Sequence, residues 1–245
     1  MATTDNFYTR TEMLVCPEGM ERLRSAHVLV VGLGGVGGYA AEMLARAGVG
    51  HLTIVDGDVV CVTNINRQLV ALHSTIGGSK SQLFGERIRD INPECKLTVV
   101  DEYIRDDRMV ELLQSQPYDY VVDAIDTLSP KVFLLYHCHR LGLPVVSSMG
   151  SAGKLDPSQV RVSDLSQSHT CPLAAMVRKR LHRMGVTDGI QVVFSTEKVA
   201  QHAMVEEIGQ NKRTTIGTIS YLPPLFGCFC ASVVINQLIQ SEKNE

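Results

Sequence analysis

Two basic residues in this sequence have the side chains needed to act on a highly charged phosphate ester. Arg67 lies in a polar run, and Lys80 follows two glycines and a serine at the start of a helical pattern. When a carboxylate attacks the α-phosphorus of a nucleoside triphosphate, cations must first neutralise the phosphates. Arginine can make two parallel contacts to phosphate, and lysine acts as a point charge. We therefore predict catalytic roles for Arg67 and Lys80.

An acid and two amides complete this predicted site. Asp126 ends the run Asp123-Ala124-Ile125-Asp126, just after a predicted strand. Ligands bind at the carboxyl ends of parallel strands, and a carboxylate there can hold magnesium beside a triphosphate. Asn66 and Gln68 can orient phosphate or ribose through neutral hydrogen bonds. The sequence thus predicts ATP and Mg²⁺ as cofactors, with Asp126 as a catalytic residue and the metal ligand.

The nucleotide is predicted to bind at a glycine loop, Gly32-Leu33-Gly34-Gly35-Val36-Gly37, which fits G-x-G-x-x-G. In that pattern the glycines permit a tight turn, close approach of a phosphate, and packing of helix on strand. Asp56 ends the next predicted strand, where a carboxylate accepts hydrogen bonds from ribose hydroxyls. The predicted nucleotide-binding residues are Gly32, Gly34, Gly35, Gly37, Asp56, Asp58, Asn66, Arg67, Gln68 and Lys80.

Most of these positions have a second interpretation. Arg67 and Lys80 could lie on a solvated surface, and Asp126 could cap a helix that begins at Pro130. Asn64 fits a turn as well as a ligand contact. Nicotinamide dehydrogenases use the same glycine loop, but hydride transfer needs neither a triphosphate clamp nor a magnesium carboxylate. The polar residues therefore favour ATP over a nicotinamide nucleotide.

The elements that must position these residues alternate between strand and helix. Short β-branched and apolar runs predict strands at His27–Val31, His51–Val55, Lys96–Val100, Tyr118–Asp123 and Leu143–Ser148. Apolar residues at helical spacing predict helices at Val36–Ala47, Ser81–Ile91, Arg108–Gln114 and Pro130–Arg140. Strand, glycine turn, helix and strand in this order open a doubly wound parallel sheet.

The alternation changes after Gly150. Strands are predicted at Gln159–Asp164 and Ile190–Ser195, and helices at Leu173–Met184 and Leu225–Gln240. We predict an α/β fold, Rossmann-like and doubly wound, whose mostly parallel sheet has an antiparallel C-terminal extension. Residues 1–245 are predicted to form a single adenylyltransferase-like domain. It comprises an N-terminal arm (1–26), a nucleotide-binding core (27–150) and a substrate-side extension (151–245).

Composition argues against several other classes of protein. The sequence has 23 Lys and Arg against 26 Asp and Glu, a formal net charge of −3, so it lacks the broad positive surface that wraps nucleic acid. Its 7 cysteines include no C-x-x-C pair, which argues against a disulfide framework and a structural zinc site. The apolar stretch Tyr221–Ile235 is too short to cross a bilayer. We expect no membrane span and a cytoplasmic protein.

As a set, these motifs resemble the ubiquitin-activating-enzyme-like adenylyltransferases of the ThiF/MoeB type. The matching pieces are Gly32–Gly37, Asp56-x-Asp58, Asn64-x-Asn66-Arg67-Gln68, Lys80 and Asp123–Asp126. Arg10 matches the N-terminal arginine that in this family reaches across a homodimer to the partner's ATP. The resemblance therefore implies a homodimer in which Arg10 is a catalytic residue.

Within that family the sequence is similar to the tRNA threonylcarbamoyladenosine dehydratases. The strings that carry this likeness are Arg10–Glu12, Asn64–Gln68, Arg87–Pro93, Val121–Asp126 and Phe194–Glu197. The resemblance implies that ATP activates the threonyl carboxylate of a modified adenosine in the tRNA anticodon loop, after which loss of water closes a ring. The alternative is adenylylation of the C-terminal glycine of a small ubiquitin-like sulfur-carrier protein. A sulfur-transfer or carrier protein is a possible partner.

The predicted helix Leu173–Met184 offers a place for tRNA phosphates. On a helical wheel Leu173, Met176, Val177, Leu181 and Met184 are predicted to face inward, leaving Arg178, Lys179, His182 and Arg183 outward. The alternative is an ordinary solvated face.

Cys171, just before this helix, matches the region where relatives that activate sulfur carriers have a cysteine, so both a thiol role and a packed thiol are considered. Tyr103, Tyr118 and Tyr136 form no aromatic platform pattern, and each is predicted to pack in the core or at a sheet edge.

Overall fold

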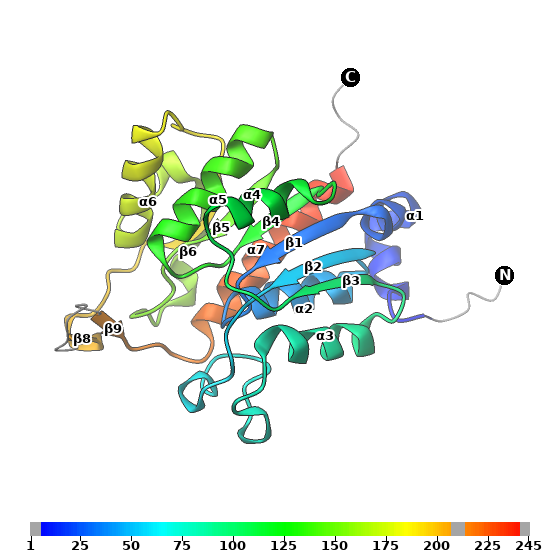
Figure 1. The fold of residues 1–245 in the computed structure, drawn as a ribbon, viewed down its shortest axis with the longest axis horizontal. Coiled ribbons are helices and arrows are strands. Elements are labelled where there is room, and N and C mark those ends of the chain that lie inside the picture. The colour runs from blue at the N-terminus through cyan, green and yellow to red at the C-terminus, as the bar shows by residue number, and fades with distance from the viewer. Residues whose placement is uncertain (1–5, 207–213, 241–245) are drawn as a thin grey trace.

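A seven-stranded sheet forms the centre of the molecule (Figure 1). The computed structural model describes residues 6–206 and 214–240. The strands are β1 (His27–Val31), β2 (His51–Val55), β3 (Lys96–Val100), β4 (Tyr120–Asp123), β5 (Val145–Ser148), β6 (Val160–Asp164) and β7 (Gln191–Ser195). Their order is β3-β2-β1-β4-β5-β7-β6, and neighbours run parallel except that β6 is antiparallel to β7. The predicted mostly parallel sheet with an antiparallel extension is confirmed.

Helices cover both faces of this sheet (Figure 1). One layer comprises α1 (Thr9–Ser25), α2 (Gly37–Ala47), α3 (Lys80–Ile91) and α7 (Leu222–Gln240), and the other comprises α4 (Asp106–Gln114), α5 (Leu128–Leu141) and α6 (Pro172–Arg183). Strand β1 shows how the sequence builds two cores. Val28 and Val30 enter the first apolar cluster, whereas Leu29 and Val31 enter the second. Alternate strand residues point to opposite faces, so a strand covered on both sides must be apolar throughout.

Several helices begin earlier than the sequence predicted. Helix α4 begins at Asp106 instead of Arg108, α5 at Leu128 instead of Pro130, and α7 at Leu222 instead of Leu225. The prolines of α5 and α7 lie in the first turn, where a missing N–H leaves no intrahelical hydrogen bond unmade. Proline was therefore a marker of the first turn and not of the first residue.

Helix α1 and a small hairpin were not predicted. Helix α1 is kinked at Cys16, which has a φ of 63° and stands immediately before Pro17. The kink lies there because a residue before proline is disfavoured from the α conformation. Its buried Met20 and Leu23 pack in the first core cluster, so much of the predicted N-terminal arm belongs to the folded body.

The hairpin pairs β8 (Met204–Glu206) with β9 (Thr214–Ile216) and lies at the end of the molecule away from α1 (Figure 1). Short 3₁₀ helices are η1 (Val62–Asn64), η2 (His73–Thr75), η3 (Pro157–Gln159), η4 (Leu165–Gln167) and η5 (Gln201–Ala203).

Helix α7 is the one helix in the described part of the chain that is long and apolar enough to cross a membrane, by length and composition alone. Its residues Leu222, Phe226, Cys230 and Val234 are buried in the first core cluster. Core helices of folded domains meet the same criteria of length and composition. The apolar character of α7 is accounted for by its packing against the sheet, α1 and α2.

A stacked histidine pair near the start of the sheet gives a pH prediction. The rings of His27 and His51 lie 4.0 Å apart, and His27 Nε2 is 2.8 Å from Thr53 Oγ1. Burial, with the neighbouring His51, lowers the pKa of His27 to about 4. Below about pH 6.5 the unfolded chain therefore binds a proton that the folded chain does not, so stability falls as the pH drops toward 4.

We expect His27→Gln to remove about 1–2 kcal/mol of the stability difference between pH 7 and pH 4.5. Urea unfolding at the two pH values measures this. His182→Gln, a change at an exposed histidine on α6, is the matched control. Equal pH dependence in wild type and His27→Gln would contradict the assignment.

Candidate functional site

The glycine loop connects β1 to α2 and packs directly on the turn that follows β4. Gly32 has a φ of +90°, and a Cβ there would lie 2.8 Å from the carbonyl oxygen of Ala124. A Cβ on Gly37 would lie 1.8 Å from the carbonyl oxygen of Gly32. Both positions therefore require glycine, as predicted for the tight turn and the helix–strand contact. The start of α2 lies beside this turn, and although the N–H groups of Gly38 and Ala40 donate to the carbonyl oxygens of Gly34 and Val36, the positive end of the helix there suits an anion.

Asp56 ties the end of β2 to the glycine loop. Its Oδ2 accepts the backbone N–H of Leu33 at 2.6 Å, and its Oδ1 accepts that of Asp58 at 2.8 Å. Burial raises the pKa of Asp56, although these two backbone donors oppose the shift. The carboxylate thus has a structural role in positioning the loop. Each oxygen retains a lone pair for the ribose contact that the sequence predicted.

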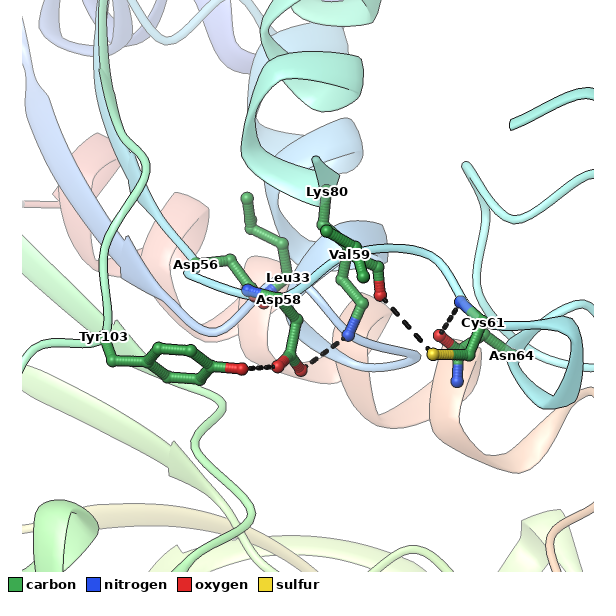
Figure 2. Close-up of polar contacts among 8 residues, drawn as sticks. All are labelled: Leu33, Asp56, Asp58, Val59, Cys61, Asn64, Lys80 and Tyr103. Atoms are coloured by element: carbon green, nitrogen blue, oxygen red, sulfur yellow. Dashed lines mark hydrogen bonds and ion pairs between the residues drawn. The ribbon is translucent and has the colours of Figure 1, made fainter. Parts of the chain in front are cut away.

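Lys80, Asp58 and Tyr103 form a connected group at the same edge of the sheet (Figure 2). Lys80 is the first residue of α3 and is 5% exposed, and its Nζ lies 2.8 Å from Asp58 Oδ2. Tyr103 donates its hydroxyl to Asp58 Oδ1. Burial alone would raise the pKa of Asp58, but the hydrogen bonds from Lys80 and Tyr103 lower it. Lys80 is therefore a buried, directed cation, and the interpretation as a solvated surface residue is wrong.

Tyr103 was missed as a residue of the site. It was predicted to pack in the core or at a sheet edge, but its side chain is 63% exposed. The available signal was its place in the loop that follows β3, because β1, β2 and β3 are parallel neighbours and their carboxyl ends lie at the same end of the sheet. The contact with Asp58 spans 45 positions of sequence, which no local pattern reveals.

Arg67 and Gln68 lie against the glycine loop. A Cβ on Gly35 would approach Arg67 Cγ at 3.3 Å, and one on Gly34 would approach Gln68 Nε2 at 3.7 Å. Arg67 Nη1 donates to the carbonyl oxygen of Thr63 and to Asn66 Oδ1, both at 2.9 Å. The structure thus brings this polar run to the loop, as predicted, with Arg67 half-buried.

Two asparagines in this region hold backbone in place. Asn64 Oδ1 accepts the N–H of Cys61 at 3.0 Å, which supports its interpretation as a turn residue. Asn66 Nδ2 donates to the carbonyl oxygen of Thr218 at 2.9 Å. Asn66 thereby joins the polar run to the segment between β9 and α7.

Asp126 is exposed in the turn between β4 and α5. Helix α5 begins at Leu128 with Thr127 at the N-cap position, so Asp126 does not cap a helix beginning at Pro130. The described residues contain no group of three or more His, Cys, Asp or Glu side chains that could hold a metal ion. Magnesium beside a nucleotide needs only one or two carboxylates, since phosphates and water supply the other oxygens. Asp126 therefore fits a nucleotide-bound magnesium and not an all-protein metal cage.

A fully buried ion pair lies behind this turn, and sequence reasoning did not find it. Lys131 Nζ, on α5, lies 2.6 Å from Asp123 Oδ2, 3.1 Å from Ser147 Oγ and 3.0 Å from the carbonyl oxygen of Ser148. Asp123 Oδ1 also accepts the N–H of Ile125 at 3.1 Å. These bonds tie α5 to the ends of β4 and β5, so they fix β4 and α5, the two elements that flank the turn carrying Asp126.

Arg10 lies apart from the other predicted site residues of the same chain. It is exposed near the start of α1, where Met13 and Leu14 are 80% and 84% exposed and line an open depression with it. Tyr8 packs beside Gly48 at the carboxyl end of α2, whereas the glycine loop is at the amino end. Within one chain, the structure does not bring Arg10 to the glycine loop.

The basic helix α6 differs from its prediction in three residues. Met176 and Met184 are 47% and 41% exposed, so neither faces inward. Arg178 is half-buried and donates to the carbonyl oxygens of Leu165 and Ser168, at 3.2 and 2.6 Å. Arg178 thus holds a loop and is not part of the outward face. Lys179, His182 and Arg183 are exposed, as predicted.

Cys171 is 3% exposed at the N-cap position of α6. Its side chain packs in the second core cluster. This burial matches the interpretation of Cys171 as a packed thiol.

Comparison with known proteins gives a consistent group of relatives. The model of the ThiF family matches residues 8–245. A tRNA threonylcarbamoyladenosine dehydratase of Bacillus subtilis is 40% identical over 228 residues, covering 92% of this chain and 89% of that protein. A crystal structure of E. coli tRNA N6-threonylcarbamoyladenosine dehydratase in complex with ATP has a TM-score of 0.86 at 38% identity, covering 95% of this chain and 93% of that one. A molybdopterin-synthase adenylyltransferase of Salmonella typhimurium is 36% identical over 154 residues, 63% of this chain and 60% of that protein.

Proposed function

Because the chain belongs to the ThiF family, we propose that it is an ATP-dependent enzyme that dehydrates threonylcarbamoyladenosine in tRNA through adenylylation of a carboxylate. The observation that carries this proposal is the buried Lys80 ammonium, held by Asp58 at the edge where the glycine loop lies. Such a directed cation suits a triphosphate. The similarity to a dehydratase solved with ATP supports the same substrate.

The residues of the site divide the work of the reaction. The start of α2 and the glycine loop bind phosphate oxygens, while Lys80 and Arg67 neutralise charge that would repel the incoming carboxylate. The threonyl carboxylate attacks the α-phosphorus, and pyrophosphate leaves. A nitrogen of the same substituent then attacks the activated carbonyl and releases AMP, so the net change is loss of one water. Because both groups belong to one substituent, proximity accelerates the second step and no enzyme thiol is needed.

Asp126 is proposed to hold Mg²⁺ against the phosphates. The exposed carboxylate after β4 is suitably placed, because the turn that carries it packs on Gly32. Bound magnesium would supply positive charge to the phosphate oxygens. The chain's own contribution is to fix the carboxylate, through the Lys131–Asp123 pair behind the turn.

A homodimer is proposed to complete the site, with Arg10 supplied by the partner chain. The separation of Arg10 from the glycine loop within one chain supports this arrangement. The exposed Met13 and Leu14 beside Arg10 provide apolar surface for such a contact. The use of ATP and tRNA supports a cytoplasmic location.

The tRNA is proposed to contact Lys179, His182 and Arg183 on α6, because these side chains are exposed on one helix. Contacts of this kind are made to phosphates, so they give affinity that depends on salt and not on sequence. Arg178 is left out, since its guanidinium is engaged with backbone carbonyls.

The alternative substrate is the C-terminal glycine of a small ubiquitin-like sulfur carrier. The similarity to a molybdopterin-synthase adenylyltransferase favours this alternative only at the level of the shared adenylylation chemistry. The buried Cys171 and the lack of C-x-x-C pairs weigh against it. A carrier or sulfur-transfer protein remains a proposed partner.

The proposal predicts a specific product. Protein, ATP, Mg²⁺ and tRNA bearing threonylcarbamoyladenosine should yield a nucleoside lighter by one water, detected by mass spectrometry of the digested tRNA. The same tRNA without ATP, and unmodified tRNA with ATP, are the controls. An unchanged nucleoside in the complete reaction, together with a stable adenylate on a carrier protein ending in Gly-Gly, would replace the proposal with its alternative.

A further inference from the structure

We propose that Tyr103 is a positioning residue of the nucleotide site, whose hydroxyl holds Asp58 so that the ammonium of Lys80 stays directed at the nucleotide phosphates. The inference rests on the proposed function, because it takes the phosphate contact of Lys80 from there. It adds a residue that acts through two others and does not itself need to touch the nucleotide.

Asp58 is the acceptor that the other two side chains share. Lys80 Nζ lies 2.8 Å from Oδ2, and the Tyr103 hydroxyl donates to Oδ1 (Figure 2). The Asp58 side chain is 46% exposed. Without the tyrosine hydrogen bond, Oδ1 of this half-exposed carboxylate would bond to water. The Asp58 side chain could then rotate, and the Lys80 ammonium bonded to Oδ2 would move with it. Tyr103 removes this freedom by anchoring the second oxygen.

Lys80 depends on Asp58 for its direction. Its backbone N–H donates to the carbonyl oxygen of Asp58 at 3.0 Å, and its side chain reaches back to the carboxylate of the same residue. Ser79 caps α3 by accepting the N–H of Gln82 at 3.3 Å, so the first turn of the helix is fixed. With the backbone held, the position of Asp58 sets where the buried ammonium points.

The path of the backbone after β3 places Tyr103 beside Asp58. Residues 101–105 follow β3 and cross the segment after β2 in direct contact, since a Cβ on Gly57 would lie 2.6 Å from the backbone nitrogen of Tyr103. Only glycine at position 57 permits that approach. The guanidinium of Arg105 lies over the Tyr103 ring, 5.9 Å from its centroid. A mostly exposed aromatic ring is thus held by its loop and by one polar contact, and not by core packing.

The chemistry of the two donors favours the same role. A carboxylate shared between a neutral hydroxyl and an ammonium binds the ammonium less tightly than one with a single donor. The hydroxyl adds no charge of its own, so Lys80 keeps its positive charge available for phosphate. The hydrogen bonds from Lys80 and Tyr103 lower the pKa of Asp58, so the ionised carboxylate is the form that this arrangement stabilises.

The test is a double-mutant cycle between Tyr103→Phe and Asp58→Asn, with ATP affinity measured by calorimetry and kcat and KM from the tRNA assay. Tyr103→Phe should weaken ATP binding and lower kcat/KM, each by about 5- to 20-fold. In the Asp58→Asn background the same change should cost less than about 2-fold, because the hydroxyl then has no carboxylate to hold. Tyr136→Phe, the same chemical change on α5, should leave both values at wild type.

Three results would overturn the inference. Tyr103→Phe could behave like Tyr136→Phe, or it could cost as much with Asp58→Asn as without it, which would mark a general structural role. In both of these cases wild-type binding of ATP leaves the proposed function standing. Failure of the wild-type protein to bind ATP would overturn the proposed function and the inference together.

Discussion

Asp126→Ala is expected to lower turnover of the tRNA substrate by at least about 10³-fold, because it removes the charge proposed to hold magnesium where the phosphate charge develops. The carboxylate is exposed in a turn, so its loss should leave the free energy of unfolding within about 0.5 kcal/mol of wild type. Product formation and urea unfolding measure the two quantities. Asp188→Ala, at an exposed aspartate in the loop after α6, is the matched control.

The same variant also tests the shared site. If Arg10 acts on the partner's nucleotide, mixed dimers of Arg10→Ala and Asp126→Ala chains contain one intact site each. Random pairing should then restore about a quarter of wild-type activity from two inactive proteins. Wild-type turnover by Asp126→Ala would refute its role, and no recovery in the mixture would refute the exchange of Arg10.

Lys131→Met is expected to destabilise the fold by about 3–5 kcal/mol, since it leaves the Asp123 carboxylate buried without its cation. Both side chains of the pair are 0% exposed, and Lys131 donates to three acceptors from β4 and β5. Urea unfolding measures the loss, and Lys179→Met on the surface of α6 is the control. The double variant Lys131→Met with Asp123→Asn should regain part of that loss, because no buried charge then remains.

A loss below about 1 kcal/mol in Lys131→Met would contradict this account of the pair. Such a result would mean that water or a rearranged neighbour replaces the ammonium. In that case the pair could not be what fixes the turn carrying Asp126.

The fold could be predicted where the residue types of one short segment were enough to identify its secondary structure and its burial. Val28–Val31 is apolar at every position, which predicts a strand covered on both faces, and the glycine run after it predicted the tight turn that the structure has there. Helix α1 offered no such pattern, because Pro17 interrupts it. Its stability comes from contacts such as the bond from Arg22 Nη2 to the carbonyl oxygen of Ile239, which spans 217 positions.

The candidate site likewise contains residues that the local sequence predicted and residues that it did not. Lys80 and Arg67 were recognisable because glycines and amides surround them in sequence. Tyr103 and Lys131 were not, because each acquires its role from a partner on another element, Asp58 in one case and Asp123 in the other. The orientation of Arg178 was also unpredictable, since the carbonyls it binds belong to a loop before the helix.

The position of α7 has a consequence for how the chain folds while it is being synthesised on the ribosome. This last helix contributes Leu222, Phe226, Cys230 and Val234 to the same apolar cluster as β1, and Gly227 packs so closely on α2 that a Cβ would lie 2.3 Å from the carbonyl oxygen of Val36. Until α7 has emerged, the face of the sheet that α1, α2 and α3 also cover lacks part of its apolar cover, although the glycine loop and the polar run after it have already been synthesised. Residues 32–126, which hold most of the candidate site, are therefore synthesised well before the helix that α2 packs against, and this side of the core is complete only once α7 has left the ribosome.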